Sequence, residues 1–246
     1  MEDKISALPD DILRHILSFL PTQNAVATTV LSKAWRFLGF SLSTLYFDDQ
    51  TYLISHKPYS SFQQFVRTIT LQQPRITSFR LKTIASQFKL LSSDFNEWIE
   101  FAMQRGVQIL DIHLAHPFAM LNLNFRVLSC RTLVVLKLKG WLCVDTPNID
   151  FPSLKTLILD AVDFIEPQYL MEFLHGCPNL EFFEAKNIEY YFHNDYSYDG
   201  GVFSLPTLIG AKVYNVELGF HLKAICNAQT LRLDKYNATL KNMDFV

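Results

Sequence analysis

The chain opens with a helix-forming pattern whose apolar face is unusually wide. On a helical wheel of residues 10–20 the large apolar side chains cover an arc of about 160°, and the polar residues lie on the other side. Pro9 fits the first helical position, where its missing N–H costs nothing, and Pro21 prevents continuation. The pattern predicts an amphipathic helix whose apolar residues are Ile12, Leu13, Ile16, Leu17, Phe19 and Leu20.

Two more short helices are expected before residue 41. Thr22 and Ser32 are candidate N-caps for them. Their apolar residues are Ala25, Val26, Val30, Leu31, Trp35, Leu38 and Phe40. A chain shorter than about 40 residues rarely folds alone without a disulfide, a metal or a partner. Since the sequence offers neither of the first two here, the excess apolar surface indicates a permanent protein partner.

Beyond residue 70 an apolar pattern of the form LxxLxL recurs. The copies are Ile76/Phe79/Leu81, Ile109/Ile112/Leu114, Leu133/Leu136/Leu138, Leu154/Leu157/Leu159, Leu180/Phe183/Ala185, Leu208/Ala211/Val213 and Ala228/Leu231/Leu233. Each copy predicts one short strand of a parallel sheet. No repeat buries its apolar side alone, so neighbours must stack into a continuous core. Leu42, Leu45 and Phe47 form an earlier, capping version of the pattern.

Segments between the copies have helical spacing of apolar residues. One helix is expected around residues 95–103, with Asp94 as its cap and Gly106 as its stop. Others are expected around residues 62–69 and between Pro167 and Gly176. The predicted fold class is α/β: a three-helix module at residues 1–45, then an irregular leucine-rich-repeat solenoid of about seven repeats at residues 46–246. Its parallel strands would have helices and loops on the convex side.

Composition narrows the function. With 246 residues, 49% of them hydrophobic, the chain can bury a substantial core, and a net charge of −2 indicates neither nucleic acid nor an anionic membrane as a partner. No apolar run is long enough to cross a bilayer, and no signal-peptide pattern follows Met1. Cys130, Cys143, Cys177 and Cys226 have no metal-type spacing. We therefore expect buried free thiols, no metal, no cofactor and an intracellular location, in the nucleus, the cytoplasm or both.

Catalytic signatures are missing from the sequence. It contains no GxSxG, P-loop, HExxH or GxGxxG motif. His113 and His116 fall on a predicted strand and its exit, so they point to opposite faces and make a poor metal pair. The chain is therefore predicted to be a non-catalytic binding protein.

Two stretches carry a family resemblance. Residues 8–21 read LPDDILRHILSFLP and residues 25–36 read AVATTVLSKAWR. Together they resemble the F-box of plant F-box/leucine-rich-repeat proteins of the FBD-associated type, with Ala34 in place of the usual basic or polar residue. The resemblance implies docking on the Skp-type adaptor of an SCF (Skp–cullin–F-box) ubiquitin ligase, and through it on a cullin. The adaptor-binding residues that it implies are Leu8, Pro9, Ile12, Leu13, Ile16, Leu17, Leu20, Pro21, Leu31, Ser32 and Trp35.

The repeats also resemble those of this family, at residues 98–107, 130–138, 151–157 and 176–181. Two departures are visible. Regular repeats have Asn eight residues after the first leucine, whereas Trp141, Val162, Ile188 and Val216 stand there, so the turns must satisfy their backbone groups differently. Many relatives also continue into a C-terminal FBD domain that this chain lacks, so it is expected to be either naturally short or truncated.

A target would bind the sheet face opposite the core, which is the concave face of such solenoids. Its middle row is predicted to be Arg80, His113, Lys137, Ile158, Glu184, Lys212 and Arg232. The first half of this row is basic, which favours an acidic or phosphorylated segment, although ordinary solvated sheet residues give the same pattern. The aromatic, acidic segment at residues 189–201 is either a recognition loop or packs on the sheet edge. Two functions stay open: the substrate receptor of the ligase, with an unknown target protein, or a ligase-independent or degenerate interaction scaffold.

Overall fold

The computed structural model describes residues 5, 8–39, 41–84, 92–115, 121–123, 128–144, 149–191, 204–216 and 222–234. The chain forms two compact units, residues 1–119 and 120–246. The predicted domain boundary between residues 45 and 46 separates the helical module from the repeats and lies inside the first unit. This boundary stays a prediction. None of the helices in the described ranges is both long and apolar enough to span a bilayer.

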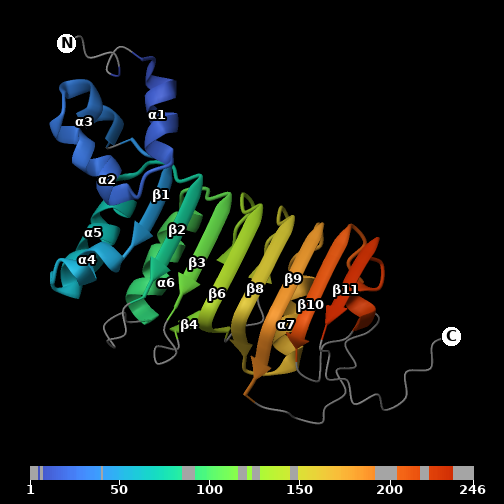
Figure 1. Ribbon diagram of the computed structural model, residues 1–246. Helices are drawn as coiled ribbons and strands as arrows, with labels where there is room; N and C mark the ends of the chain where they lie inside the picture. Colours follow the sequence, from blue (N-terminus) through green and yellow to red (C-terminus); the bar gives the residue numbers. More distant parts are fainter. Residues whose placement is uncertain are drawn as a thin grey trace. The chain divides into compact units, whose positions relative to one another are not determined.

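The first unit begins with a small helical module (Figure 1). Its elements are α1 (Asp10–Ser18), α2 (Thr22–Ala27), the 3-10 helix η1 (Thr28–Val30) and α3 (Lys33–Gly39). The predicted cap at Ser32 is present, since its Oγ accepts a bond from the Trp35 N–H at 3.4 Å. Two predicted helix starts are wrong by one residue. Pro9 was predicted as the first residue of α1 but is its N-cap. Thr22 was predicted as the N-cap of α2 but is its first residue, and its Oγ1 accepts the Tyr46 N–H at 2.7 Å instead of capping the helix.

A three-stranded parallel sheet completes the first unit. Its strands are β1 (Thr44–Asp48), β2 (Ser78–Thr83) and β3 (Ile109–Leu114), and its helices are α4 (Gln50–Ile54), α5 (Tyr59–Gln72) and α6 (Ser92–Gln104). The core between them is aromatic. The ring of Phe47 lies 5.9 Å from that of Phe65 and 5.6 Å from that of Phe79, and Phe62 meets Trp98 at 6.3 Å. The predicted capping strand and the helix at 62–69 are confirmed.

The helix predicted around residues 95–103 is also confirmed, with one correction. α6 begins at Ser92, so Asp94 lies in its first turn rather than at its cap and accepts a bond from Gln63 Nε2 at 2.8 Å. Gly106 ends the helix as predicted, because its φ of 79° is a left-handed conformation that suits glycine.

The register of the second repeat was predicted wrongly by two residues. β3 pairs with β2 so that Leu110 stands beside Phe79 and Ile112 beside Leu81. The repeat is therefore Val107/Leu110/Ile112, in agreement with the full burial of Val107 and the 38% exposure of Ile109. Both the predicted register, which starts at Ile109, and the observed one, which starts at Val107, place apolar residues at all three LxxLxL positions. Only the pairing of β3 with β2 decides between the two registers.

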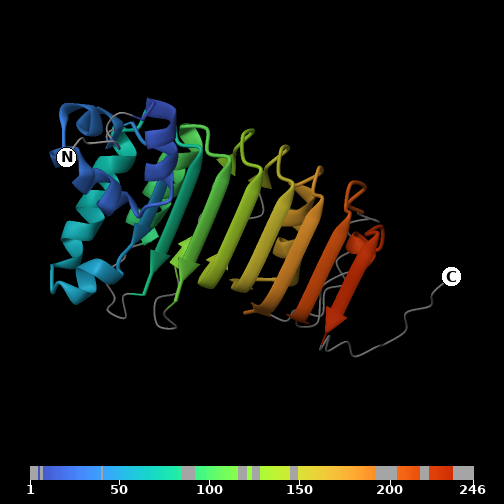
Figure 2. The ribbon, with the colours of Figure 1, turned by 45° about the horizontal axis from the view of Figure 1, so that its top comes forward.

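The second unit contains a longer parallel sheet and a separate two-stranded parallel sheet of β5 and β7. Its elements are β4 (Leu121–Leu123), β5 (Leu128–Ser129), β6 (Val135–Val144), β7 (Ile149–Asp150), β8 (Thr156–Phe164), α7 (Pro167–His175), β9 (Phe182–Tyr190), β10 (Gly210–Val216), the 3-10 helix η2 (Leu222–Ile225) and β11 (Thr230–Asp234). β6, β8, β9, β10 and β11 lie side by side with their arrowheads at one edge (Figure 2). α7 covers one face, where Phe173 meets Phe164 and Phe151 at 6.4 and 6.3 Å. Five predicted strands and the helix after Pro167 are confirmed.

A column of left-handed residues lies one position before the sites where regular repeats carry asparagine. Gly140, Ala161, Asn187 and Asn215 occupy corresponding positions within β6, β8, β9 and β10, with φ between 49° and 89°. After Ala161, Asn187 and Asn215 the next residue points inward, and Val162, Ile188 and Val216 are fully buried there. After Gly140 the strand register shifts, so Trp141 is 39% exposed and Leu142 takes the buried position beside Val162. Asn215 Nδ2 donates to Asn187 Oδ1 at 3.0 Å, and Asn187 Nδ2 donates to Asp160 Oδ1 at 3.4 Å. These side-chain hydrogen bonds between neighbouring repeats supply part of the bonding that the asparagines provide in regular repeats.

Two expectations about burial need correction. Leu231 and Leu233 of the last copy are each 42% exposed, because β11 pairs on one side only within the described chain. Cys130, Cys143 and Cys177 are buried free thiols as expected, but Cys226 is exposed.

Asp163 of β8 gives the second unit a pH-dependent stability. Its side chain is buried beside Glu189, and both effects raise the pKa of its carboxyl to about 6, while the Tyr191 hydroxyl donates to it at 3.3 Å. The folded state therefore holds this proton more tightly than the unfolded state does. The resulting stabilisation is complete below about pH 4 and is lost as the pH rises through 6.

The substitution Asp163→Asn should therefore stabilise the second unit at neutral pH. Asn keeps an acceptor for Tyr191 but removes the buried charge. We expect a gain on the order of 1 to 2 kcal/mol at pH 7.5, roughly 2–8 °C in Tm, and no gain at pH 4. Thermal melts of both proteins across this range check it, and an equal difference at both pH values would contradict it.

Candidate functional site

The apolar arc of α1 is divided between the interior and the surface. Leu13 and Leu17 are fully buried in the helical module. Ile12, Ile16 and Phe19, on the adjoining part of the same arc, are 47%, 38% and 72% exposed. The spacing of these three residues places them in one stripe along the helix. The module therefore covers only one half of the apolar arc that the sequence builds.

The predicted adaptor-binding residues fall into three groups. Leu8, Pro9, Ile12, Ile16, Leu31 and Ser32 are exposed, Leu20 and Pro21 are half-buried, and Leu13, Leu17 and Trp35 are buried. The last three lie where they support the module from inside, and a direct contact with a partner would need them to be uncovered. The binding role of all eleven residues stays a prediction.

Among the described residues up to Gly39, four exposed large apolar side chains were absent from the predicted set: Ile5, Phe19, Val30 and Phe37. Phe19 had a signal in the sequence, because it follows Ile12 and Ile16 at helical spacing and Pro21 ends the helix directly afterwards. Phe37 is 66% exposed on α3, and nothing in the local pattern separated it from the buried Trp35 and Leu38.

The polar side of α1 borders the exposed stripe. Arg14 lies 3.7 Å from the Asp10 carboxylate and 3.3 Å from that of Asp11, and these pairs are solvent-exposed. Such pairs contribute little to stability, but Asp10 and Asp11 suit the positive end of the helix dipole. The His15 ring packs edge-on against Phe19 at 4.8 Å. An apolar stripe with a charged border is the usual composition of a protein-binding surface.

A hydrogen bond from a backbone N–H to a side-chain hydroxyl joins the module to the first strand of its unit. β1 is an edge strand, and the Thr22 hydroxyl accepts the N–H of Tyr46 at 2.7 Å. Thr22 itself is fully buried. Helices α2 and α3 approach closely because Gly39 has no side chain, since a Cβ there would meet Thr29 Cγ2 and the Ala25 carbonyl. The exposed stripe is thus carried on a module with a packed interior.

The outer sheet face of the first unit neutralises its own charges. Arg80 pairs with Asp111 at 3.2 Å and Lys82 with Asp48 at 3.3 Å. The Arg80 guanidinium also lies over the Tyr46 ring, 5.5 Å from its centre. His113, which was predicted to stand in the row of Arg80, lies two residues further along beside Lys82. The basic first half expected for this row is therefore balanced by acidic neighbours at Arg80 and Lys82.

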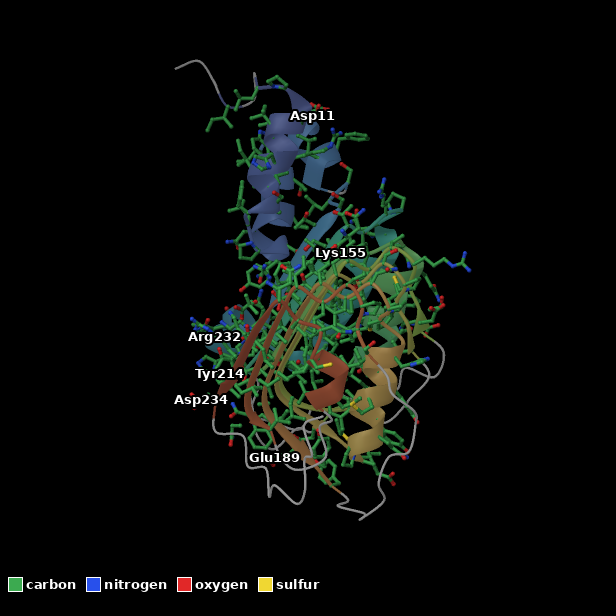
Figure 3. The ribbon with its side chains drawn as sticks, turned by 90° about the vertical axis from the view of Figure 1, so that its right-hand side faces the viewer. Asp11, Lys155, Glu189, Tyr214, Arg232 and Asp234 are labelled. Carbon is green, nitrogen blue, oxygen red and sulfur yellow. The ribbon has the colours of Figure 1, made fainter. Side chains whose placement is uncertain are left out.

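The outer face of the second unit is more open. Lys137, Ile158, Glu184, Lys212 and Arg232 stand in one row across its strands, as predicted. Figure 3 shows Tyr214, Arg232 and Asp234 on the side of the sheet away from α7. Of the predicted loop at residues 189–201, Glu189 and Tyr190 belong to β9, and residues 192–201 lie outside the described residues, as does His116.

Comparisons with known proteins identify both parts of the chain. Residues 5–43 match the F-box domain, and residues 95–194 match the leucine-rich repeats of the FBD-associated F-box protein At5g56370. An F-box followed by leucine-rich repeats on a parallel sheet defines the class of F-box/LRR proteins. The chain belongs to the plant family of F-box/leucine-rich-repeat proteins, as the resemblance indicated.

Two curated relatives, both from Arabidopsis thaliana, illustrate the similarity. FBD-associated F-box protein At4g10400 is 39% identical over 183 residues, which are 73% of this chain and 44% of the relative. F-box/LRR-repeat protein At4g14103 is 37% identical over 218 residues, which are 84% of this chain and 54% of the relative. The chain spans about half the length of these relatives.

Within the described ranges no group of three or more His, Cys, Asp or Glu side chains is arranged to hold a metal ion. Burial strongly raises the pKa of the Cys177 thiol, which therefore stays protonated and unreactive. Members of this family are generally adaptor or receptor subunits.

Proposed function

We propose that this chain is the substrate-recognition subunit of an SCF-type ubiquitin ligase, acting in the nucleus, the cytoplasm or both. The α1 stripe, made of Ile12, Ile16 and Phe19, docks on a Skp-type adaptor, and the adaptor connects the chain to a cullin. The repeat sheet binds a target protein. The chain contributes no bond chemistry of its own: it raises the effective concentration of target lysines near a ubiquitin-charged enzyme.

The half-covered apolar arc of α1 is the observation that carries the proposal. In a helix of an isolated soluble module, polar residues would stand at the positions of Ile12, Ile16 and Phe19, because apolar side chains exposed to water do not stabilise the fold. A partner that covers the stripe recovers about 25 cal/mol for each Å² of apolar surface. The match of residues 5–43 to the F-box domain makes a Skp-type adaptor the partner expected to do so.

Co-expression tests the proposal in its complete form. The full chain is produced with a plant Skp-type adaptor and a cullin, purified through a tag on the chain, and analysed by size-exclusion chromatography. We expect one species that contains all three proteins. Recovery of the chain without the adaptor would reject the docking assignment. Recovery with the adaptor but without the cullin would favour the ligase-independent or degenerate scaffold.

A further inference from the structure

A surface hollow of about 400 Å³ lies on the outer sheet face of the second unit, over β8, β9, β10 and β11. We call it the Gly210 hollow. Two rows of residues line it. In the first row Thr156, Phe182, Gly210 and Thr230 stand side by side on successive strands. The second row, two residues further along the strands, is Ile158, Glu184, Lys212 and Arg232.

Gly210 forms the floor of the hollow. No left-handed backbone conformation requires glycine there, and glycine inside a strand weakens it. A Cβ at this position would lie 3.1 Å from Thr230 Oγ1 and 3.4 Å from the Phe182 ring. The recess at Gly210 is therefore too narrow for a side chain of its own, and the hollow opens above it between the Phe182 ring and Thr230. Phe182 is 48% exposed, so its ring offers an apolar wall that the protein itself leaves partly uncovered.

The second row supplies an unbalanced positive charge. Lys212 pairs with Glu184 at 3.6 Å. Arg232 stands beside Lys212 on β11, and no carboxylate of the described residues forms an ion pair with it. Elsewhere on this face Lys186 pairs with Asp160 at 4.0 Å, whereas Lys137 and Lys139 have no described acidic partner. Asp234 and Glu189 are exposed carboxylates of these strands that form no ion pair with a described residue, but neither lines the Gly210 hollow, so the hollow itself attracts an acidic ligand.

We propose that the Gly210 hollow binds an extended segment of the target protein that carries an apolar side chain two positions from an aspartate or glutamate. This inference deepens the proposed receptor function and rests on it. The apolar side chain lies against Phe182 over Gly210, and the carboxylate pairs with Arg232. The two rows are two strand residues apart, about 6.6 Å, which is also the separation of alternate side chains in an extended peptide.

A neighbouring hollow on the same sheet face extends the site at its polar end. A second, polar hollow of about 550 Å³ is lined by Glu184, Lys186, Asn187, Tyr214, Asn215 and Asp234. It lies two to three residues further along the strands, where the fifth residue of an extended segment would reach. Polar or basic side chains suit this end, since Tyr214 and Asp234 offer hydrogen bonds and one negative charge.

Selection from a displayed library of random ten-residue peptides tests the proposal. The bait is the full chain in complex with its adaptor. We expect enrichment of sequences with Leu, Ile, Met or Phe two positions from Asp or Glu. Fluorescence polarisation should then show that an enriched peptide binds the Arg232→Glu variant at least tenfold more weakly than it binds the wild type. Changing the aspartate of the peptide to lysine should restore its affinity for the Arg232→Glu variant. Phe182→Ala, which leaves the strand backbone unchanged, should also weaken binding at least fivefold.

Arg131→Glu is the matched control, because Arg131 is exposed on the turn before β6 and outside the hollow. It should change peptide affinity less than twofold. Enrichment of basic or purely polar peptides, absence of any enrichment, or equal binding by Arg232→Glu and wild type would overturn the proposal. Adaptor binding is measured for every variant. The Arg232→Glu variant should retain full affinity for the adaptor. If the hollow does not bind the peptide, only peptide binding departs from expectation, whereas if the receptor function is wrong, adaptor binding itself is missing from the wild type.

Discussion

Replacing Ile16 by glutamate is expected to weaken the affinity for a Skp-type adaptor by at least about 100-fold, close to 3 kcal/mol. Ile16 lies at the centre of the α1 stripe and is partly exposed. The substitution removes an apolar anchor, which commonly contributes 2 kcal/mol or more, and also places a charge in a surface that binding would cover. Isothermal titration calorimetry of the purified chain against the adaptor measures the loss.

The same substitution at Ile54 provides the control. Ile54 belongs to α4 of the same unit, is 70% exposed and lies outside the α1 stripe. Ile54→Glu should change the affinity less than threefold. Equal losses for both variants would mean that general damage to the first unit, rather than contact through α1, weakens binding. An unchanged affinity for Ile16→Glu would place the adaptor elsewhere.

Trp35→Ala should destabilise the helical module by about 3 to 5 kcal/mol, the usual range for removing a buried aromatic side chain. Trp35 lies on α3 and is only 6% exposed. The sequence resemblance placed Trp35 in direct contact with the adaptor, whereas its burial indicates that it supports the α1 stripe from inside. Hydrogen exchange of the free chain should therefore be faster in residues 10–39 of the variant, and adaptor binding should fall as a consequence.

Trp141→Ala is the matched comparison because Trp141 is 39% exposed on β6. It should cost less than about 1 kcal/mol. The exchange pattern separates two explanations for a binding defect. Ile16→Glu should leave the exchange of residues 10–39 unchanged in the free chain. If Trp35→Ala also left it unchanged while abolishing binding, Trp35 would contact the adaptor directly.

Periodicity was sufficient to predict most elements of this fold. The apolar arc at residues 10–20 and the LxxLxL copies are strong local signals, because helices and strands repeat at different intervals. The short helices α2 and α3 were also placed by their flanking Pro21 and Ser32. These features depend on residues close together in the chain.

The errors concern properties that depend on distant residues. Whether Leu17 or Ile16 is buried is decided by how α1 packs on α3, and both residues lie on the same apolar arc. The register of β3 is decided by its pairing with β2, since Val107 and Ile109 fit the pattern equally well. This error displaced His113 from the predicted target-binding row.

The left-handed column shows a similar limit. The sequence revealed that the regular asparagines were absent, but Gly140, Ala161, Asn187 and Asn215 are of three residue types, so no single type identifies the column in advance. Only the alignment of neighbouring strands brings them into one column. Likewise, the recess at Gly210 depends on Phe182 and Thr230, which are 28 and 20 residues away in the chain.

Photocrosslinking from the exposed stripe tests the central claim most directly. Benzoylphenylalanine is introduced in place of Phe19, and separately in place of Ile54, in the full chain mixed with the Skp-type adaptor. We expect irradiation to join position 19 to the adaptor and to leave position 54 unlinked. An adaptor that binds the chain but crosslinks from position 54 and not from position 19 would contradict the assignment of α1 as the docking surface.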